Sequence, residues 1–87
     1  ADREFQQIFN EKLQDFKVML DDKELEILET RILADNPVTL QFIGDKYGIS
    51  KERVRQIESR LVGKIRQYME TQLPDFKRLE LPVPEKD

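Results

Sequence analysis

The chain has 87 residues, a formal net charge of −3, and neither cysteine nor histidine. This length suits one small domain, and the missing residue types exclude disulfides, imidazole catalysis and zinc sites built on those ligands. The sequence also lacks a long apolar run, a signal peptide, a glycine-rich phosphate loop and a nucleophile elbow. We therefore expect a cytoplasmic protein that is not an enzyme and has no metal or cofactor.

Apolar residues recur at helical spacing over residues 3–20, which predicts an amphipathic helix there. These residues are Phe5, Ile8, Phe9, Leu13, Phe16 and Leu20. Two interpretations stay open: the stripe is a core face of the domain, or it is a docking face for a segment outside this chain. Residues 1–20 are accordingly either packed on the domain or part of a linker.

A second helix is predicted to begin after Asp21, because Asp21 and Glu24 have the spacing of a capping box. It should end at Asn36, since the residue before Pro37 avoids helical geometry. The apolar residues on one side of this helix are Leu25, Leu28 and Ile32.

Two further helices follow, each preceded by a hydroxyl side chain that suits an N-cap. Thr39 precedes a helix over about 40–47, and Ser50 precedes a longer one that starts at Lys51 and runs to roughly Gln72. No stretch alternates as a strand would, so the expected fold is a small all-α domain of about four helices. We divide the chain into an N-terminal helix 1–20, a helix-turn-helix domain 21–73 and, because of its prolines, a flexible tail 74–87.

Residues 40–59 have the spacing of a DNA-binding helix-turn-helix. Gly44 has no side chain, so two helices can cross closely over it, and Gly48 can adopt the left-handed conformation that ends the first helix. The apolar positions that would fill the inner side of the motif are Ile43, Tyr47, Ile49, Val54 and Ile57. The motif predicts a recognition helix that begins at Lys51.

The charge of the chain is unevenly distributed. Residues 1–36 hold ten acidic and five basic residues, whereas residues 50–72 hold six basic and three acidic ones. Because phosphates respond to charge within about 10 Å at ordinary salt, this asymmetry matters more than the total charge. The nucleic-acid face is therefore predicted on the last helix.

At about 100° per residue, the last helix has a buried and an exposed face. Its predicted buried stripe is Val54, Ile57, Leu61, Ile65 and Tyr68. Recognition helices present their first turns to base edges, so the predicted base-contacting residues are Lys51, Glu52, Arg55 and Gln56. Glu52 also has a simpler explanation, because an acid near a helix N-terminus is favourable. The residues assigned to the DNA backbone or a protein partner are Thr39, Ser50, Arg53, Ser59, Arg60 and Lys64.

Two segments of the chain resemble a known family. The stretch beginning Thr39-Leu40-Gln41 and ending Ser50-Lys51-Glu52-Arg53-Val54-Arg55-Gln56-Ile57-Glu58 closely resembles region 4 of bacterial sigma factors of the sigma-70 family. The segment from Leu20 to Leu28 resembles the start of the same region, so the resemblance covers about residues 20–70. The continuation from Leu61 to Arg66 looks most like the heat-shock-type alternative sigma factors.

The resemblance implies a C-terminal domain of a longer protein that binds the promoter −35 element in the major groove. It also implies docking on the flap-tip helix of the RNA polymerase β subunit. Carried across by residue, base readout falls on the same four side chains, and Arg53 and Arg60 match positions near DNA backbone or activator contacts. The expected partners are double-stranded promoter DNA and the polymerase core, with an anti-sigma factor or activator as further candidates, and the isolated chain is expected to be a monomer.

Two other functions stay open at this point. The motif also permits a free-standing helix-turn-helix regulator, for which the helix over 3–20 would be the dimer interface. A protein-interaction bundle that has lost DNA binding is the other alternative.

Phe42 departs from the pattern of the family that the chain resembles. Many relatives carry an acid at this position, three residues after Thr39, where it completes a capping box. Phe42 is either an exposed hydrophobic residue or packs on a partner or on the first helix.

Overall fold

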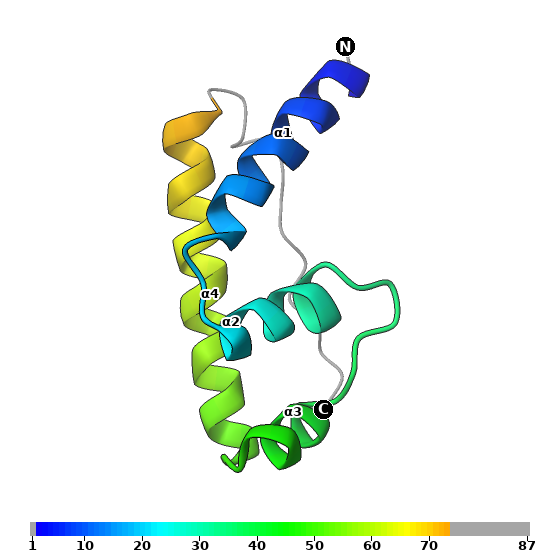
Figure 1. Cartoon of the computed structure of the whole chain (residues 1–87), viewed down its shortest axis with the longest axis vertical. Helices are drawn as coiled ribbons and strands as arrows, with labels where there is room; N and C mark the ends of the chain where they lie inside the picture. Colours follow the sequence, from blue (N-terminus) through cyan, green and yellow to red (C-terminus); the bar gives the residue numbers. More distant parts are fainter. Residues whose placement is uncertain (1, 74–87) are drawn as a thin grey trace.

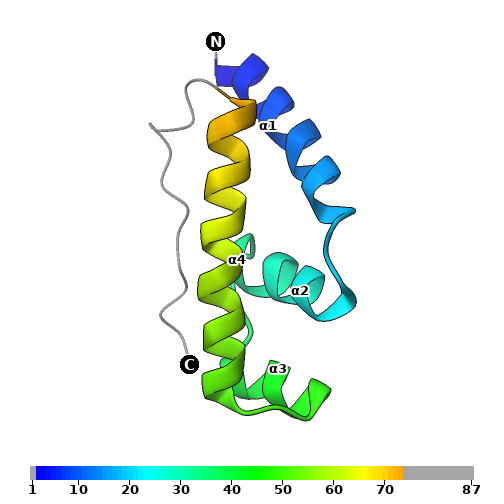
Figure 2. The same ribbon diagram turned by 90° about the vertical axis from the view of Figure 1, so that its left-hand side faces the viewer.

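The computed structural model describes residues 2–73, and the predicted flexible tail lies outside the described residues. One long helix, α4 (Lys51–Gln72), runs the length of the molecule (Figure 1). The shorter elements all lie along one side of it (Figure 2), and in chain order they are α1 (Asp2–Lys17), α2 (Asp22–Ile27), the π-helical turn η1 (Leu28–Ile32) and α3 (Leu40–Tyr47). The described residues form four helices and no strand, which confirms the predicted all-α fold.

The hydrophobic core lies between α4 and the elements stacked on its side. Of the predicted stripe on α4, Tyr68 is only partly buried, and the buried members are Val54, Ile57, Leu61 and Ile65. Val62 and Met69 are also buried and widen this face. No helix within residues 2–73 is both long and apolar enough to cross a membrane.

The first helix ends at Lys17, earlier than the predicted residue 20, and packs on α4 through most of its apolar stripe, although Ile8 is exposed. Leu13 and Phe16 are buried, and the ring centroids of Phe16 and Tyr68 lie 5.3 Å apart. The rings of Phe5 and Phe9 stack on each other at 6.3 Å and pack against the same core. The C-terminal half of α4 therefore packs against α1, which leaves its N-terminal half for α2 and α3.

The second helix begins as predicted but ends earlier. The Asp21 carboxylate accepts a hydrogen bond from the Glu24 amide at 2.8 Å, and the Glu24 carboxylate accepts one from the Asp21 amide at 3.3 Å. The predicted capping box is therefore present. The predicted end at Asn36 is wrong, because helical geometry stops at Ile32 and the chain then turns towards α3.

The end of the second helix widens into the π-helical turn η1. The Leu33 amide donates to the Leu28 carbonyl, five residues back, at 2.9 Å. The Thr30 hydroxyl donates to the Glu26 carbonyl at 2.6 Å and so occupies an acceptor at the change of helix type. The predicted inner side was incomplete: Leu25 is only partly buried, whereas the buried residues of α2 and η1 are Ile27, Leu28, Arg31 and Ile32.

The two N-caps of the helix-turn-helix are confirmed. The Thr39 hydroxyl accepts from the Phe42 amide at 3.0 Å, and the Ser50 hydroxyl accepts from the Arg53 amide at 3.0 Å. Each satisfies one of the amides that the first turn of a helix leaves without an intrahelical partner.

Both glycines of the motif have the roles that their spacing predicts, except that Gly44 is approached by the backbone of the turn and not by a second helix. Gly48 adopts the left-handed conformation at φ 68° and ends α3. Gly44 is buried, and a Cβ there would lie 2.6 Å from the Ile49 carbonyl oxygen. The close approach over Gly44 is therefore made by the backbone of the turn and not by a crossing helix.

Alanine at Gly44 and alanine at Gly63 should change the free energy of unfolding in opposite directions. A methyl group at Gly44 would meet the Ile49 carbonyl, so we expect a loss of about 1–3 kcal/mol. A Cβ at Gly63, on the exposed side of α4, meets nothing within 4 Å, and the higher helix propensity of alanine should add about 0.5–1 kcal/mol. Urea unfolding followed by circular dichroism measures both, and a stabilised Gly44→Ala would contradict the close approach.

Phe42→Glu should stabilise the domain. Phe42 is 52% exposed, so its ring loses little on removal. A glutamate there can accept from the Thr39 amide and complete a second capping box, worth about 0.5–1 kcal/mol. Phe42→Ala is the matched control, because it removes the ring without supplying a carboxylate. A clear loss of stability in both variants during urea unfolding would show that the ring makes contacts that the fold needs.

Candidate nucleic-acid interface

The first two turns of α4 present a row of exposed polar side chains. All four predicted base-contacting residues lie there, and they are Lys51, Glu52, Arg55 and Gln56. Val54 lies between them in the sequence and Ile57 directly follows them, and both are buried, so they attach this end of the helix to the core. The row therefore projects from a firmly packed helix end.

Side chains on this surface already contact one another. Arg55 Nη1 lies 2.7 Å from Glu52 Oε2, and Arg53 Nη1 donates to Gln56 Oε1 at 3.3 Å. The Arg55 and Glu52 side chains are 51% and 63% exposed, so their ion pair contributes only a few tenths of a kcal/mol and is easily exchanged for other partners. An arginine fork suits guanine, a glutamine amide suits adenine, and a carboxylate can accept from cytosine.

The six residues assigned to the DNA backbone or a protein partner have different environments. The hydroxyls of Thr39 and Ser50 cap α3 and α4. Lys64 pairs with Glu24 at the start of α2, at 3.2 Å, and so points along the protein surface. The remaining residues have exposed side chains on the first half of α4 and are Arg53, Ser59 and Arg60.

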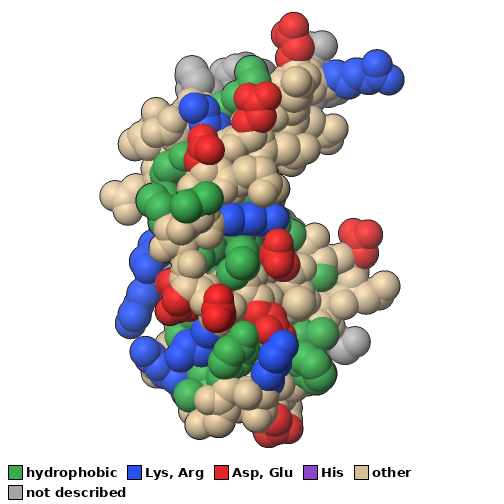
Figure 3. Space-filling model, in the orientation of Figure 1, with side chains coloured by type: hydrophobic (Ala, Val, Ile, Leu, Met, Phe, Trp, Pro, Cys, Tyr) green, Lys and Arg blue, Asp and Glu red, His purple; other side chains and the backbone are tan. Residues whose placement is uncertain are grey.

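Charged side chains are unevenly distributed over the surface. In the view of Figure 3, several lysine and arginine side chains lie along the edge formed by α4, and the rest of this face carries acidic side chains mixed with a few basic ones. Two ion pairs attach α2 to the later helices: Lys64 of α4 pairs with Glu24, and Lys46 of α3 pairs with Glu26 at 2.7 Å. The basic edge includes the row of side chains at the start of α4.

Tyr47 links α3 to α2 through its hydroxyl, a role that its place among the apolar positions of the motif did not reveal. The hydroxyl donates to Glu26 Oε1 at 2.7 Å, and Lys46 Nζ lies 2.7 Å from the same oxygen. Hydrogen bonds from Lys46 and Tyr47 hold the pKa of Glu26 below its ordinary value. The hydrogen bond to the Glu26 carboxylate raises the pKa of Tyr47 to about 12.

A buried ion pair beneath the interface was not predicted from the sequence. Arg31 Nε donates to Glu58 Oε2 at 2.5 Å and Nη2 donates to Oε1 at 3.3 Å, with the side chains 1% and 3% exposed. Arg31 Nη1 also donates to the Val38 carbonyl at 2.5 Å. One signal was available: Glu58 stands at core spacing between Val54 and Leu61, where an acid needs a buried partner.

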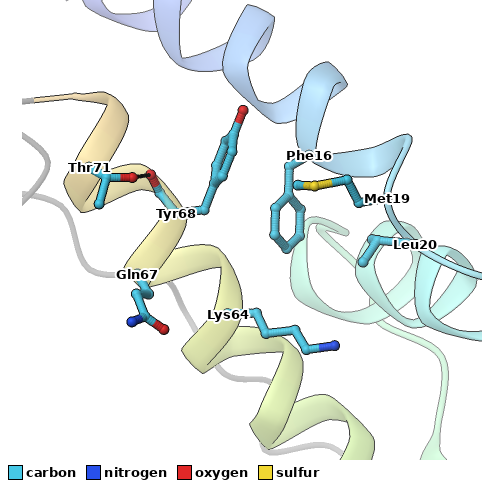
Figure 4. A pocket seen from close by; sticks show the side chains of 7 residues that line it. All are labelled: Phe16, Met19, Leu20, Lys64, Gln67, Tyr68 and Thr71. Carbon is cyan, nitrogen blue, oxygen red and sulfur yellow. Dashed lines mark hydrogen bonds between the residues drawn. The ribbon is translucent and has the colours of Figure 1, made fainter.

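A shallow groove lies between the end of α1 and the second half of α4, away from the row at the start of α4. Figure 4 shows the side chains that line it, which are Phe16, Met19, Leu20, Lys64, Gln67, Tyr68 and Thr71. The lining is mainly apolar, which suits contact with protein side chains better than contact with phosphates.

The family model described as "Sigma-70, region 4" matches residues 19–67, which include the whole helix-turn-helix. The chain belongs to the sigma-70 region 4 family. The match begins and ends close to the limits expected from the sequence, and it contains every residue assigned above to DNA or a partner.

Several curated proteins resemble this member of the sigma-70 region 4 family. The "RNA polymerase sigma factor RpoH" of Caulobacter vibrioides is 46% identical over 57 residues, which is 66% of this chain and 19% of that protein. Its namesake in Zymomonas mobilis is 45% identical over 60 residues, or 69% and 20%. The "RNA polymerase sigma-B factor" of Myxococcus xanthus is 35% identical over 66 residues, or 76% and 27%. The RpoH matches agree with the expected likeness to heat-shock-type factors, and the chain spans about a quarter or less of each relative's length.

The Glu26–Tyr47 contact should give the stability of the domain a defined dependence on pH. A carboxyl with a lowered pKa stabilises the fold above its unfolded value of 4.5, and this contribution is lost as the pH falls through the lower folded value. A phenol with a raised pKa contributes fully below its unfolded value of 10.0, and this contribution is lost as the pH rises through about 12.

Urea unfolding of the wild type, Glu26→Gln and Tyr47→Phe across this pH range tests both directions. We expect the difference between the wild type and Glu26→Gln to shrink in acid, and that between the wild type and Tyr47→Phe to shrink in strong alkali. Differences that are the same at every pH would contradict the contact.

Proposed function

We propose that this chain is the part of a sigma factor that recognises the promoter −35 element by placing the start of α4 in the major groove. In this role it binds DNA as a component of RNA polymerase during transcription initiation and catalyses no reaction. Four side chains contact base edges: Lys51, Glu52, Arg55 and Gln56. Residues beside them contact the phosphates.

The observation that carries this proposal is the row of four exposed polar side chains on the first two turns of a packed helix. The helix start adds amide groups and a positive dipole end, which favour nearby phosphate. The basic side chains along the edge formed by α4 in Figure 3 support the same orientation, which places the more acidic first third of the chain further from DNA. Membership of the sigma-70 region 4 family and the names of the relatives support the choice of promoter DNA.

The partners of this function are double-stranded promoter DNA and the polymerase core, contacted through the flap of its β subunit. An anti-sigma factor or an activator that contacts Arg53 or Arg60 is a further candidate. We place the protein in the cytoplasm and expect a monomer in isolation. The packing of α1 supports this last point, because a free-standing regulator would need the same apolar stripe for its dimer interface.

Binding of the domain to a duplex with a −35-like element, compared with a scrambled duplex at two salt concentrations, tests the proposed function. We expect preference for the element and an affinity that falls as salt rises, because each phosphate contact releases counterions. Equal, salt-sensitive binding would limit the function to non-specific affinity. Absence of binding at low salt would overturn the proposal in favour of the protein-interaction bundle.

Arg55→Ala should weaken binding to the preferred duplex by about 1–3 kcal/mol and relax the preference at one base step. Arg66→Ala is the matched control, because it removes the same charge from an exposed position further along α4. We expect the control to weaken binding less and equally on every sequence. Fluorescence anisotropy with duplexes changed one base pair at a time measures this, and a uniform loss for Arg55→Ala would assign Arg55 to the phosphate backbone.

A further inference from the structure

The start of α3 is attached to the π-helical turn η1 through the backbone amide and the backbone carbonyl of Val38. The Val38 amide donates to the Thr30 carbonyl at 3.1 Å, and the Val38 carbonyl accepts from Arg31 Nη1 at 2.5 Å. Val38 directly precedes Thr39, the N-cap of α3. The position at which α3 begins is therefore set by hydrogen bonds with two neighbouring residues of η1, of which Thr30 accepts and Arg31 donates.

The same guanidinium also holds α4. Glu58 lies two residues after Gln56 but on the buried side of the helix, and it receives two hydrogen bonds from Arg31. A bidentate arginine–carboxylate pair has a preferred plane and direction, unlike a contact between apolar side chains. It therefore restricts the rotation of α4 about its own axis as well as its distance from η1.

We infer that Arg31 is a positioning residue for DNA reading, which acts through Glu58 and Val38 without touching DNA. Its guanidinium joins the segment that leads into the first helix of the motif, the second helix and the π-helical turn at one point, and so sets how the row on α4 is presented relative to α3. This inference rests on the proposed function, because it concerns the accuracy of base contacts. A residue needed only for stability would change folding but leave the choice of sequence intact.

The geometry favours positioning over stabilisation for a physical reason. Burying a guanidinium and a carboxylate has a large desolvation cost, and well-packed apolar residues of similar volume often give equal or greater stability. Such apolar residues lack directional hydrogen bonds, so they would not fix the orientation of one helix relative to the other. The pair is buried next to the one place where both helices of the motif need a fixed orientation, and no buried side-chain nitrogen or oxygen among the described residues lacks a partner.

The test replaces the pair by apolar residues, with Arg31→Met and Glu58→Leu combined in one variant. Leu13→Ala is the control, because it removes a buried side chain of α1 and lowers stability far from the α3–α4 contact. Affinities for the −35-like and scrambled duplexes are measured for each, at a temperature where circular dichroism shows the same helix content. The readout is the ratio of the two affinities.

We expect the double variant to lose about tenfold or more of this ratio, which corresponds to about 1.4 kcal/mol, while its affinity for the scrambled duplex stays near the wild-type value. Leu13→Ala should keep the wild-type ratio. If the double variant keeps the ratio as well, Arg31 is structural only and the inference is overturned. If the double variant does not fold, Glu58→Gln, which retains one acceptor oxygen, takes its place with the same expected direction.

A second measurement decides the inference even if the wild type shows no sequence preference, an outcome that would count against the proposed function alone. The chain has no cysteine, so Asp45→Cys on α3 and Glu70→Cys on α4 allow two spin labels at exposed positions. Double electron–electron resonance spectroscopy then gives the distribution of distances between the labels. We expect a narrow distribution in the wild type and Leu13→Ala backgrounds and a shifted or broadened one in the double variant. An unchanged distribution would overturn the inference.

Discussion

A charged arginine removed from water beneath the start of α4 constrains everything around it. The guanidinium of Arg31 is stable there only while it keeps the Glu58 carboxylate and the Val38 carbonyl, because an unpaired buried charge costs several kcal/mol. Those partners lie on α4 and on the segment before α3, so η1, α3 and α4 have to be in place together. The π-helical turn, the path of the following segment and the seating of the long helix are therefore parts of one arrangement.

The two halves of the long helix α4 have different roles. Its second half packs against α1 through Tyr68 and its neighbours, and its first half carries the polar row while holding α3 through the core. Between these regions α2 is attached to the middle of α4 by the Lys64–Glu24 pair, and the Tyr47–Glu26 hydrogen bond attaches it to α3. A helix of ordinary length would reach only one of these regions, so the length of α4 is what brings packing and DNA reading into one small fold.

The features predicted correctly from the sequence depend on residues within a few positions of each other. The caps at Asp21, Thr39 and Ser50 and the left-handed Gly48 are local, and amphipathic spacing located the helices and most of the core. The Arg31–Glu58 pair joins residues 27 positions apart and the Tyr47–Glu26 bond joins residues 21 apart, so local patterns did not identify these partners, although Glu58 stands at core spacing on its helix. The same holds for the early end of the second helix, which depends on tertiary contacts. The exposure of the four residues at the start of α4 followed from the helical wheel, while their contact with bases stays a prediction.

The uneven distribution of charge between the acidic residues 1–36 and the basic residues 50–72 gives the molecule a dipole as well as a net charge of −3. At distances well beyond the Debye length, DNA experiences neither the net charge nor the dipole of the protein. At shorter distances the net charge repels the polyanion, while the dipole turns the basic edge towards it. Added salt screens both the repulsion and the attraction. The affinity for DNA should consequently fall less steeply with ionic strength than the number of phosphate contacts alone would require, and encounters in the wrong orientation should be rejected before contact.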